Sequence, residues 1–236
     1  MPEFLIDHKF KEIIPPFPSV ASYMVFCGKS RSGKSSLITA LLTNPKMYKR
    51  AFHNIIICIP YHSFRSMKES DNPFKDLDEE KIFHDLSIVT LETIYSMVQH
   101  FSSEEMDSLL ILDDFASELK NNELLKMFNM LINNRRHLRL SIWMSVQTYL
   151  SIPLSNRKTI NFLVLFKCSN KREINSIWEE MSFLTKENFY ELLKFVFDRP
   201  FEYLVLDRDN NQYYKKFSEI IVKEENVIQE KDESKN

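Results

Sequence analysis

The 236-residue sequence contains very little glycine. Its two glycines are Gly28 and Gly33, whereas average usage near 7 % would give about 16 in a chain of this length. Both lie in one short segment, which reads C-G-K-S-R-S-G-K-S from Cys27 to Ser35. Glycine is retained where a side chain would block a close backbone approach or strain a turn. This segment is therefore the first candidate for a functional site.

The sequence also has few cysteines, a net charge close to zero and no long apolar run. Cys27, Cys58 and Cys168 are far apart in apolar runs, which excludes a disulfide framework or zinc site and predicts buried thiols in a reducing compartment. The formal net charge of −2 indicates no general basic field, so any surface for nucleic acid must be local. The start of the chain lacks a signal-peptide pattern, and no run approaches the roughly 20 apolar residues that span a bilayer. We expect a soluble intracellular protein with no membrane segment.

Apolar strands alternate with amphipathic helices, and this alternation predicts an α/β fold of three layers around a mostly parallel sheet. We expect an irregular, proline-rich arm at 1–20, one domain at 21–222 and a charged, disordered tail at 223–236. Residues 61–85 read as a surface excursion. Strands are expected at 23–27, 54–59, 87–90, 108–112, 140–146, 160–166, 201–206 and 212–217, the last two as a hairpin, and helices at 35–42, 91–101, 118–134, 171–180 and 185–197.

The glycine-containing segment matches the phosphate-binding pattern G-x-x-x-x-G-K-S, with an apolar strand before it and a helix after it. In this pattern the Lys34 ammonium would reach the β- and γ-phosphates, and the Ser35 hydroxyl would ligate Mg²⁺. An ordinary loop is the alternative, which the flanking strand and helix disfavour. We therefore expect Mg²⁺ and ATP here, with the nucleotide bound by Gly28, Lys29, Ser30, Arg31, Ser32, Gly33, Lys34, Ser35 and Ser36.

Polar residues follow two later apolar strands. Asp113 and Asp114 end the run L-L-I-L, as in a Walker B strand, so Asp113 would hold Mg²⁺ and Asp114 would polarise the attacking water. Gln147 ends the next strand. In ATPases with an extra strand between the two Walker strands, such a residue senses the γ-phosphate. Adjacent acids in a plain loop and a solvated strand end are the alternative interpretations.

Hydrolysis also needs a cation against the charge of the transition state, commonly an arginine of a neighbouring subunit. The candidates flank the strand that ends at Gln147, and the residues alone leave the choice among them open: Arg135, Arg136, Arg139 and Arg157.

The order of these motifs resembles a known family. G-x-x-x-x-G-K-S, L-L-I-L-D-D-F, N-R-R-H-L-R-L-S-I-W-M-S-V-Q and F-E-Y-L-V-L-D…Y-Y-K-K-F are similar to motifs of the genome-packaging ATPases of poxviruses, giant viruses and virophages, in the FtsK–HerA superfamily. The resemblance covers about residues 17–217. The Arg136-His137 pair leading to Gln147, the stretch Ile152–Arg157 and the terminal hairpin carry it. The family loop usually reads G-P-S-G-S-G-K-S, so Lys29 and Arg31 depart from it.

The resemblance implies a P-loop NTPase fold with a C-terminal β-hairpin and a motor that hydrolyses ATP. The motor would translocate double-stranded DNA of any sequence into a capsid. It would work as a homo-oligomeric ring with Arg136 or Arg157 acting in trans, docked on a capsid vertex or portal protein. The implied location is the viral factory in the host cytoplasm, the virion, or both.

Other classes remain as alternatives. A small-molecule kinase or nucleotide switch is disfavoured by the paired acids and by Gln147, and no N-K-x-D base-recognition sequence is present. A conjugation-type or partition-type DNA pump usually carries further domains. An inactive structural relative is disfavoured by intact Lys34, Ser35, Asp113 and Gln147.

Overall fold

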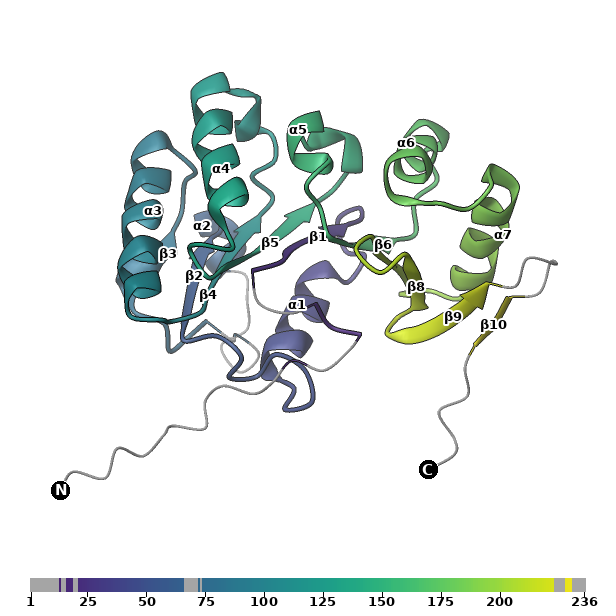
Figure 1. The fold of residues 1–236 in the computed structure, drawn as a ribbon, viewed down its shortest axis with the longest axis horizontal. Coiled ribbons are helices and arrows are strands. Elements are labelled where there is room, and N and C mark those ends of the chain that lie inside the picture. Colours follow the sequence, from purple (N-terminus) through teal and green to yellow (C-terminus); the bar gives the residue numbers. More distant parts are fainter. Residues whose placement is uncertain are drawn as a thin grey trace.

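A computed structural model describes residues 13, 16–18, 21–65, 72, 74–222 and 228–230. Its strands form one ten-stranded sheet in the order β10-β9-β8-β7-β6-β1-β5-β4-β2-β3 (Figure 1). Pairing is parallel from β6 to β3 and antiparallel from β6 to β10. The strands are β1 (Tyr23–Cys27), β2 (Asn54–Cys58), β3 (Ile82–Phe83), β4 (Ser108–Asp113), β5 (Leu140–Val146), β6 (Phe162–Phe166), β7 (Tyr203–Asp207), β8 (Gln212–Lys215), β9 (Ser218–Val222) and β10 (Ile228–Glu230).

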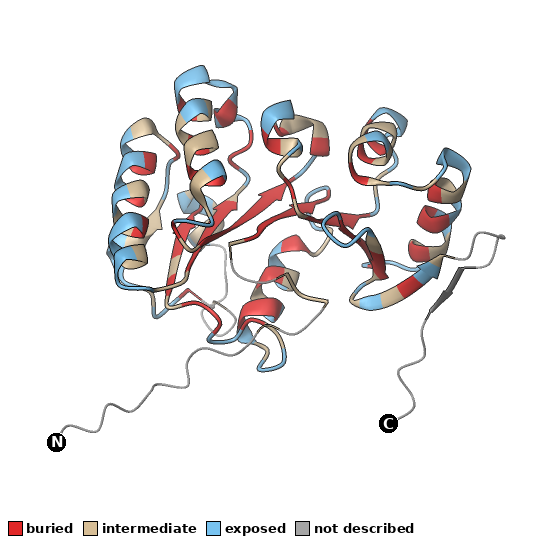
Figure 2. Ribbon diagram, in the orientation of Figure 1, coloured by how far each residue is buried: buried red, intermediate tan, exposed pale blue. Residues whose placement is uncertain are grey.

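Helices cover both faces of this sheet, which confirms the expected three layers and the mostly parallel α/β fold (Figures 1 and 2). Apolar side chains of α3, α4, α6 and α7 pack on one face, and those of α1 pack on the other. The helices are α1 (Lys34–Thr43), α2 (Tyr61–Arg65), α3 (Ile88–Ser103), α4 (Asn122–Asn134), α5 (Leu154–Arg157), α6 (Lys171–Met181) and α7 (Lys186–Val196), with short 3₁₀ turns η2 (Glu79–Lys81), η3 (Glu118–Lys120) and η4 (Tyr149–Ser151). None of the helices in the described ranges is long and apolar enough to cross a membrane.

The central strands are continuous apolar runs because both of their faces are covered. All five residues of β1 and all seven of β5 are buried. Trp143 of β5 is fully buried, and its ring lies 5.0 Å from Tyr48 and 5.7 Å from Phe26, measured between ring centroids. All three cysteines are free, and Cys27 and Cys58 are buried as the sequence predicts. Cys168, which follows β6 rather than lying within a strand, is only partly buried, so the prediction of burial is wrong there.

Helix caps explain where the predicted boundaries are wrong. Residues 87–90 were expected to be a strand, but the Ser87 hydroxyl accepts a hydrogen bond from the Thr90 amide at 3.1 Å and starts α3. The extra parallel strand is β3 instead, inside the segment interpreted as a surface excursion. Asn121 caps α4 in the same way, so residues 118–134 form a 3₁₀ turn and a separate helix rather than one helix.

The C-terminal hairpin is confirmed as β7 and β8, and β9 extends it. β10 pairs antiparallel with β9, so the expectation of disorder throughout 223–236 is wrong at 228–230. The rest of that tail lies outside the described residues.

Most of the N-terminal arm at 1–20 also lies outside the described residues. Phe17 of the arm packs its ring against Tyr48 and Phe217. The three-part division of the chain stays a prediction.

Candidate active site

Three parallel strands bring the motif residues to one edge of the sheet. β5 lies between β1 and β4, and the Gly28 amide donates to the Val146 carbonyl at 3.1 Å. Parallel strands end at the same edge, so the loop after β1, the acids of β4 and Gln147 after β5 meet there. They enclose a cavity of about 250 Å³, lined by Ser30, Arg31, Lys34, Ser35, Ser63, Asp113, Asp114, Ser145 and Gln147.

The two glycines serve the loop for different reasons. A β-carbon on Gly28 would lie 2.6 Å from the Phe166 β-carbon and 2.8 Å from the Ser32 hydroxyl oxygen, so the close approach of β6 excludes a side chain. Gly33 has φ +105°, a backbone conformation that favours glycine. Gly33 precedes α1, and the amides of the first helical turn have no partners within the helix. The loop can therefore present N–H groups to an anion.

Lys34 is the first residue of α1, directly after the loop, and is buried. Its ammonium donates hydrogen bonds to the carbonyls of Gly28 and, at 3.2 Å, Lys29. Burial lowers the pKa of Lys34, and the carboxylates of Asp113 and Asp114 oppose this shift. The hydrogen bonds of the ammonium are thus made to backbone carbonyls of the loop. It can exchange these bonds for bonds to the oxygens of a ligand.

Asp113 lies deeper than Asp114. Burial raises the pKa of Asp113, and the neighbouring Asp114 carboxylate adds to the rise, while the Ser145 hydroxyl and the Lys34 ammonium counteract it. Asp113 sits opposite Ser145 in the β4–β5 register. The charged form of Asp113 is therefore partly desolvated, as suits a metal ligand.

Asp114 and Gln147 are joined directly. The Gln147 Nε2 donates to the Asp114 Oδ2 at 2.7 Å. Asp114 has φ +62°, and its amide donates to the Ser145 carbonyl at 3.0 Å. The turn after β4 therefore directs this carboxylate toward the end of β5. The sequence motifs identify both residues, but they do not reveal this hydrogen bond.

Two further residues of the cavity were missed. Ser145 lies near the carboxyl end of β5, two residues before Gln147, and both line the cavity. A polar residue so close to the end of an apolar strand could have identified it. Ser63 comes from α2, in a segment read as a surface excursion. No pattern in that segment marks it.

The cavity contains donors that suit a magnesium ion. Ser35 and Asp113 line it together and also line the adjoining hollow under α1. Hydroxyl and carboxylate oxygens are hard ligands of the kind that Mg²⁺ accepts, usually with several waters. A cluster of three or more His, Cys, Asp or Glu side chains, which would suit a softer or fully caged metal, is not found among the described residues.

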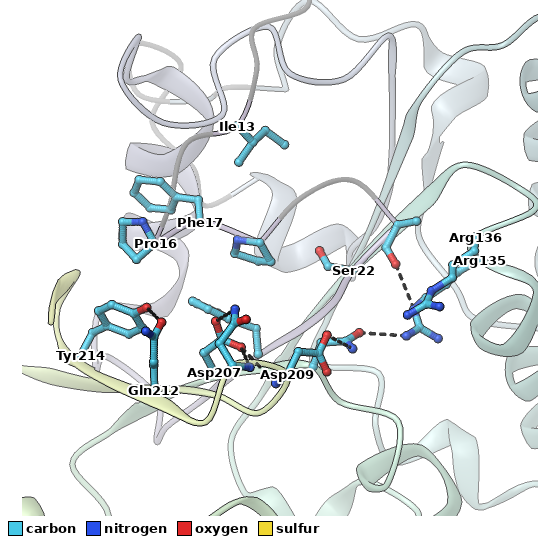
Figure 3. Close-up of a pocket in the computed structure, with 15 residues that line it drawn as sticks. Ile13, Pro16, Phe17, Ser22, Arg135, Arg136, Asp207, Asp209, Gln212 and Tyr214 are labelled. Atoms are coloured by element: carbon cyan, nitrogen blue, oxygen red, sulfur yellow. Dashed lines mark hydrogen bonds between the residues drawn. The ribbon is translucent and has the colours of Figure 1, made fainter. Parts of the chain in front are cut away.

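Arg136 lies at the opposite edge of the sheet. With Arg135 it lines a separate cavity of about 720 Å³, beside Ser22 and Phe162, where β1 and β6 begin (Figure 3). Ser22 and Gly28 flank β1 and are six residues apart along an extended chain, which separates them by about 20 Å. Arg136 is exposed. It cannot reach the phosphate loop of its own chain.

The other candidate arginines make internal contacts. Arg135 donates to the Ala21 carbonyl at 3.0 Å and to the Asn161 Oδ1 at 2.9 Å. Arg139 Nε lies 3.0 Å from the Asp107 carboxylate. Arg157 Nη1 lies 2.9 Å from Glu180 Oε1, and its guanidinium covers the Tyr149 ring at 5.3 Å from the centroid. These three side chains hold the fold together within one chain.

The sequence matches the family model described as Poxvirus A32 protein over residues 19–233. The chain belongs to the Poxvirus A32 family. This confirms the resemblance to viral packaging ATPases that the motif order indicated. None of the curated protein sequences compared with it matches significantly.

Solved structures show the same fold. B204, the DNA-packaging ATPase from Sulfolobus turreted icosahedral virus, has a TM-score of 0.64 and 17 % identity, covering 84 % of this chain and 97 % of B204. The packaging NTPase B204 of Sulfolobus turreted icosahedral virus 2, in complex with ATP-γS, has a TM-score of 0.58 and 16 % identity, over 82 % of this chain and 96 % of B204. The type VII secretion ATPase EccC of Thermomonospora curvata (TM-score 0.53, 13 % identity) matches 80 % of this chain with only 23 % of its own cytoplasmic domain. This A32-family chain thus has the fold of a viral genome-packaging NTPase.

Gly28→Ala should destabilise the protein, because the added β-carbon would lie 2.6 Å from the Phe166 β-carbon, a backbone-anchored atom that cannot swing away. Overpacking of this kind costs about 1–3 kcal/mol. For a chain of this size we expect a fall in melting temperature of about 2–12 °C in circular dichroism melts. Ala40→Gly, on the exposed face of α1, is the control, because it shows how far an ordinary helical substitution lowers the melting temperature. An unchanged melting temperature for Gly28→Ala would show that β6 does not press on the loop.

Asp113→Asn should stabilise the nucleotide-free protein at neutral pH. Burial raises the pKa of Asp113 in the folded state, so the folded protein binds this proton more tightly than the unfolded chain does, and stability is lost as pH rises through the folded pKa. Asparagine carries no charge to desolvate. The gain should shrink as the pH falls toward the unfolded pKa of about 3.9. Urea titrations at several pH values measure it, with the exposed Asp76→Asn as control; a loss of stability near pH 7 would contradict the prediction.

Proposed function

We propose that this chain hydrolyses ATP and uses the energy to translocate double-stranded DNA into a viral capsid. The observation that carries the proposal is the Gln147–Asp114 hydrogen bond of 2.7 Å in a cavity shared with Lys34 and Asp113. A phosphate loop alone suits many nucleotide-binding proteins. A carboxylate held beside it by a strand-end amide supports activation of water.

Binding of ATP begins with exchange at Lys34. Its ammonium would leave the carbonyls of Gly28 and Lys29 for the β- and γ-phosphate oxygens, while loop amides and the start of α1 receive the remaining phosphate oxygens. Ser35 and Asp113 would hold Mg²⁺, which neutralises charge on the β- and γ-phosphates. Burial disfavours the charged forms of both Lys34 and Asp113 before the ligand binds. Bound nucleotide with Mg²⁺ would supply charge partners and so offset this desolvation free energy.

The hydrolytic step follows from the geometry around Asp114. Its carboxylate would accept a hydrogen bond from the attacking water and align it with the γ-phosphorus. Gln147 Nε2 donates to one carboxylate oxygen, which leaves the other for the water. When a γ-phosphate is present, Gln147 can also donate to it and so couple the position of Asp114 to the state of the nucleotide.

A ring of subunits completes the site. Transition-state charge calls for a further cation, and Arg136 is too distant in its own chain but exposed. Of the two arginines implied by the family resemblance, we favour Arg136 as the trans-acting group, because Arg157 is held by Glu180 and Tyr149. In a head-to-tail ring the surface bearing Arg136 would meet the phosphate-loop surface of the next subunit.

DNA would be held through its phosphates and without sequence preference, as a pump requires. The ring would dock on a capsid vertex or portal protein and act in the viral factory, the virion, or both. The family and the resemblance to packaging ATPases support these partners. Because the net charge is −2, the DNA-facing surface would be a local one.

The test of this function is ATPase activity with and without double-stranded DNA. Activity should rise with DNA of any sequence and the stimulation should fall steeply as salt rises, because phosphate contacts release counterions. Lys34→Ala should lack activity under all conditions, since the charge facing the β- and γ-phosphates is gone. Stimulation restricted to one DNA sequence, or no stimulation of an active ATPase, would favour a nucleotide switch or kinase.

Mixing two inactive variants tests the shared site. Arg136→Ala should lower the ATPase rate about 10³-fold or more if the arginine acts on the transition state. Mixed with Lys34→Ala, it should regain activity, because some boundaries then join an intact loop to an intact arginine. Lys126→Ala, which removes an exposed cation from α4, serves as control and should keep its activity. If Arg136→Ala is inactive and mixing restores nothing, the arginine does not act across the boundary.

A further inference from the structure

A second hollow adjoins the phosphate loop on the side away from Asp113 and Asp114 and includes Asp198 and Glu202 in its lining. It has a volume of about 340 Å³, and Lys29, Arg31, Ser32, Phe166, Arg199 and Phe201 line it. Arg31 also lines the cavity that contains Asp113 and Gln147. The two hollows therefore lie along the same loop, one toward β5 and β4, the other toward β6 and β7.

Phe201 is unusual within this hollow. The residue is 72 % exposed, although burying a phenylalanine is favourable. Its φ is +62°, a conformation that a bulky side chain rarely adopts. Among the described non-glycine residues with positive φ, it is the only aromatic one. Neither core packing nor backbone preference explains a phenylalanine at this position.

The ring of Phe201 lies against the phosphate loop. Its Cδ1 is 3.9 Å from the position that a β-carbon on Gly33 would occupy, so the ring reaches the residue at the start of α1. Pro200 precedes it and restricts the backbone. The turn between α7 and β7 thus presents an exposed aromatic face beside the loop.

The charges around the hollow suit the sugar–phosphate part of a nucleotide. Asp198 is paired with Lys215 at 2.9 Å, and Glu202 with Lys216 at 3.0 Å. No ion pair is recorded for Lys29, Arg31 or Lys167 with an acid in the part of the chain that the structure describes. Both acids of the hollow therefore have a cationic partner, and Arg199 also lies 3.7 Å from Asp198. Among the described residues, the cations of the hollow that remain without an acidic partner are Lys29, Arg31 and Lys167.

We propose that this hollow is the nucleoside half of the ATP site and that Phe201 stacks on the base. The inference rests on the proposed function, because it takes the direction of the nucleotide from it. The terminal phosphate faces Asp113 and Asp114 on the β4–β5 side, so the base extends along the loop to the β6–β7 side, where Phe201 lies. Stacking on an aromatic face accepts any base.

Calorimetric titration with two probes separates base contacts from phosphate contacts. The probes are AMPPCP with Mg²⁺ and inorganic tripolyphosphate with Mg²⁺. Phe201→Ala should weaken AMPPCP binding about 5- to 150-fold, the range for loss of one base–aromatic stack, and should change tripolyphosphate affinity less than about twofold. Phe201→Tyr should bind AMPPCP like the unsubstituted protein, because the aromatic face remains.

Two further variants control for folding and for exposed aromatic residues in general. Phe183, which is 59 % exposed and packs on Tyr213 away from the hollow, should be replaceable by alanine without effect on either probe. Phe201→Gly relieves the positive-φ strain, so it should melt no lower than the unsubstituted protein yet lose AMPPCP affinity as Phe201→Ala does.

Equal AMPPCP affinity with and without the Phe201 ring would overturn the inference, and so would an equal loss for both probes. Failure of the unsubstituted protein to bind either probe would instead overturn the proposed function. The two failures are distinguishable, because the second is seen before any substitution is made.

Discussion

The insertion of β5 between β1 and β4 is the constraint on which the site depends. The β1–β5 register pairs Cys27 with Val146, and the β4–β5 register pairs Asp113 with Ser145. Each strand therefore ends level with its neighbours, and whatever follows it emerges at one edge. A shift of one residue in β5 would move Ser145 and Val146 each to the opposite face of the sheet and would displace Gln147, which follows them, from Asp114. The full burial of β5 on both faces, with Trp143 packed against Phe26 and Tyr48, makes such a shift costly.

That rigid frame lets the site hold charges in unfavourable surroundings. Burial shifts the pKa of Lys34 down and that of Asp113 up, so both charged forms are disfavoured in the free protein. The two shifts have opposite signs and a common cause, and each group partly relieves the other. In the proposed function, a polyphosphate with a metal ion would bring partners for both at once. Preorganised charge of this kind is typical of sites that stabilise transferring phosphoryl groups.

Much of the fold and of the phosphate loop was predictable, because the sequence of each segment matches the environment that it occupies in the folded protein. A buried parallel strand must be a continuous apolar run, so β1, β2, β4 and β5 are visible in the sequence. The loop needs glycine at positions 28 and 33, and a glycine-poor chain makes both obvious. β3 was not predictable, since two residues carry no periodicity and its pairing with β2 is a tertiary event. The positions of Arg136 and Arg157 could not be predicted either, because they depend on where helices and strands end in space. Arg136 is exposed at the edge of the sheet opposite the phosphate loop. Arg157 is enclosed by Glu180 and Tyr149.

Glycine scarcity also changes how the remaining sharp turns are made. Arg31, Asp114 and Phe201 all have φ near +62°, and all three border the two hollows along the phosphate loop. Positive φ by itself is no mark of function here, because Arg50, Glu105 and Lys216 share it at other positions. The consequence lies in the side chains. At these turns the chain carries a guanidinium that borders both hollows, a carboxylate that borders the first and an aromatic ring that borders the second. The same turns that shape the loop's surroundings can thereby supply the groups that contact phosphate, water and base.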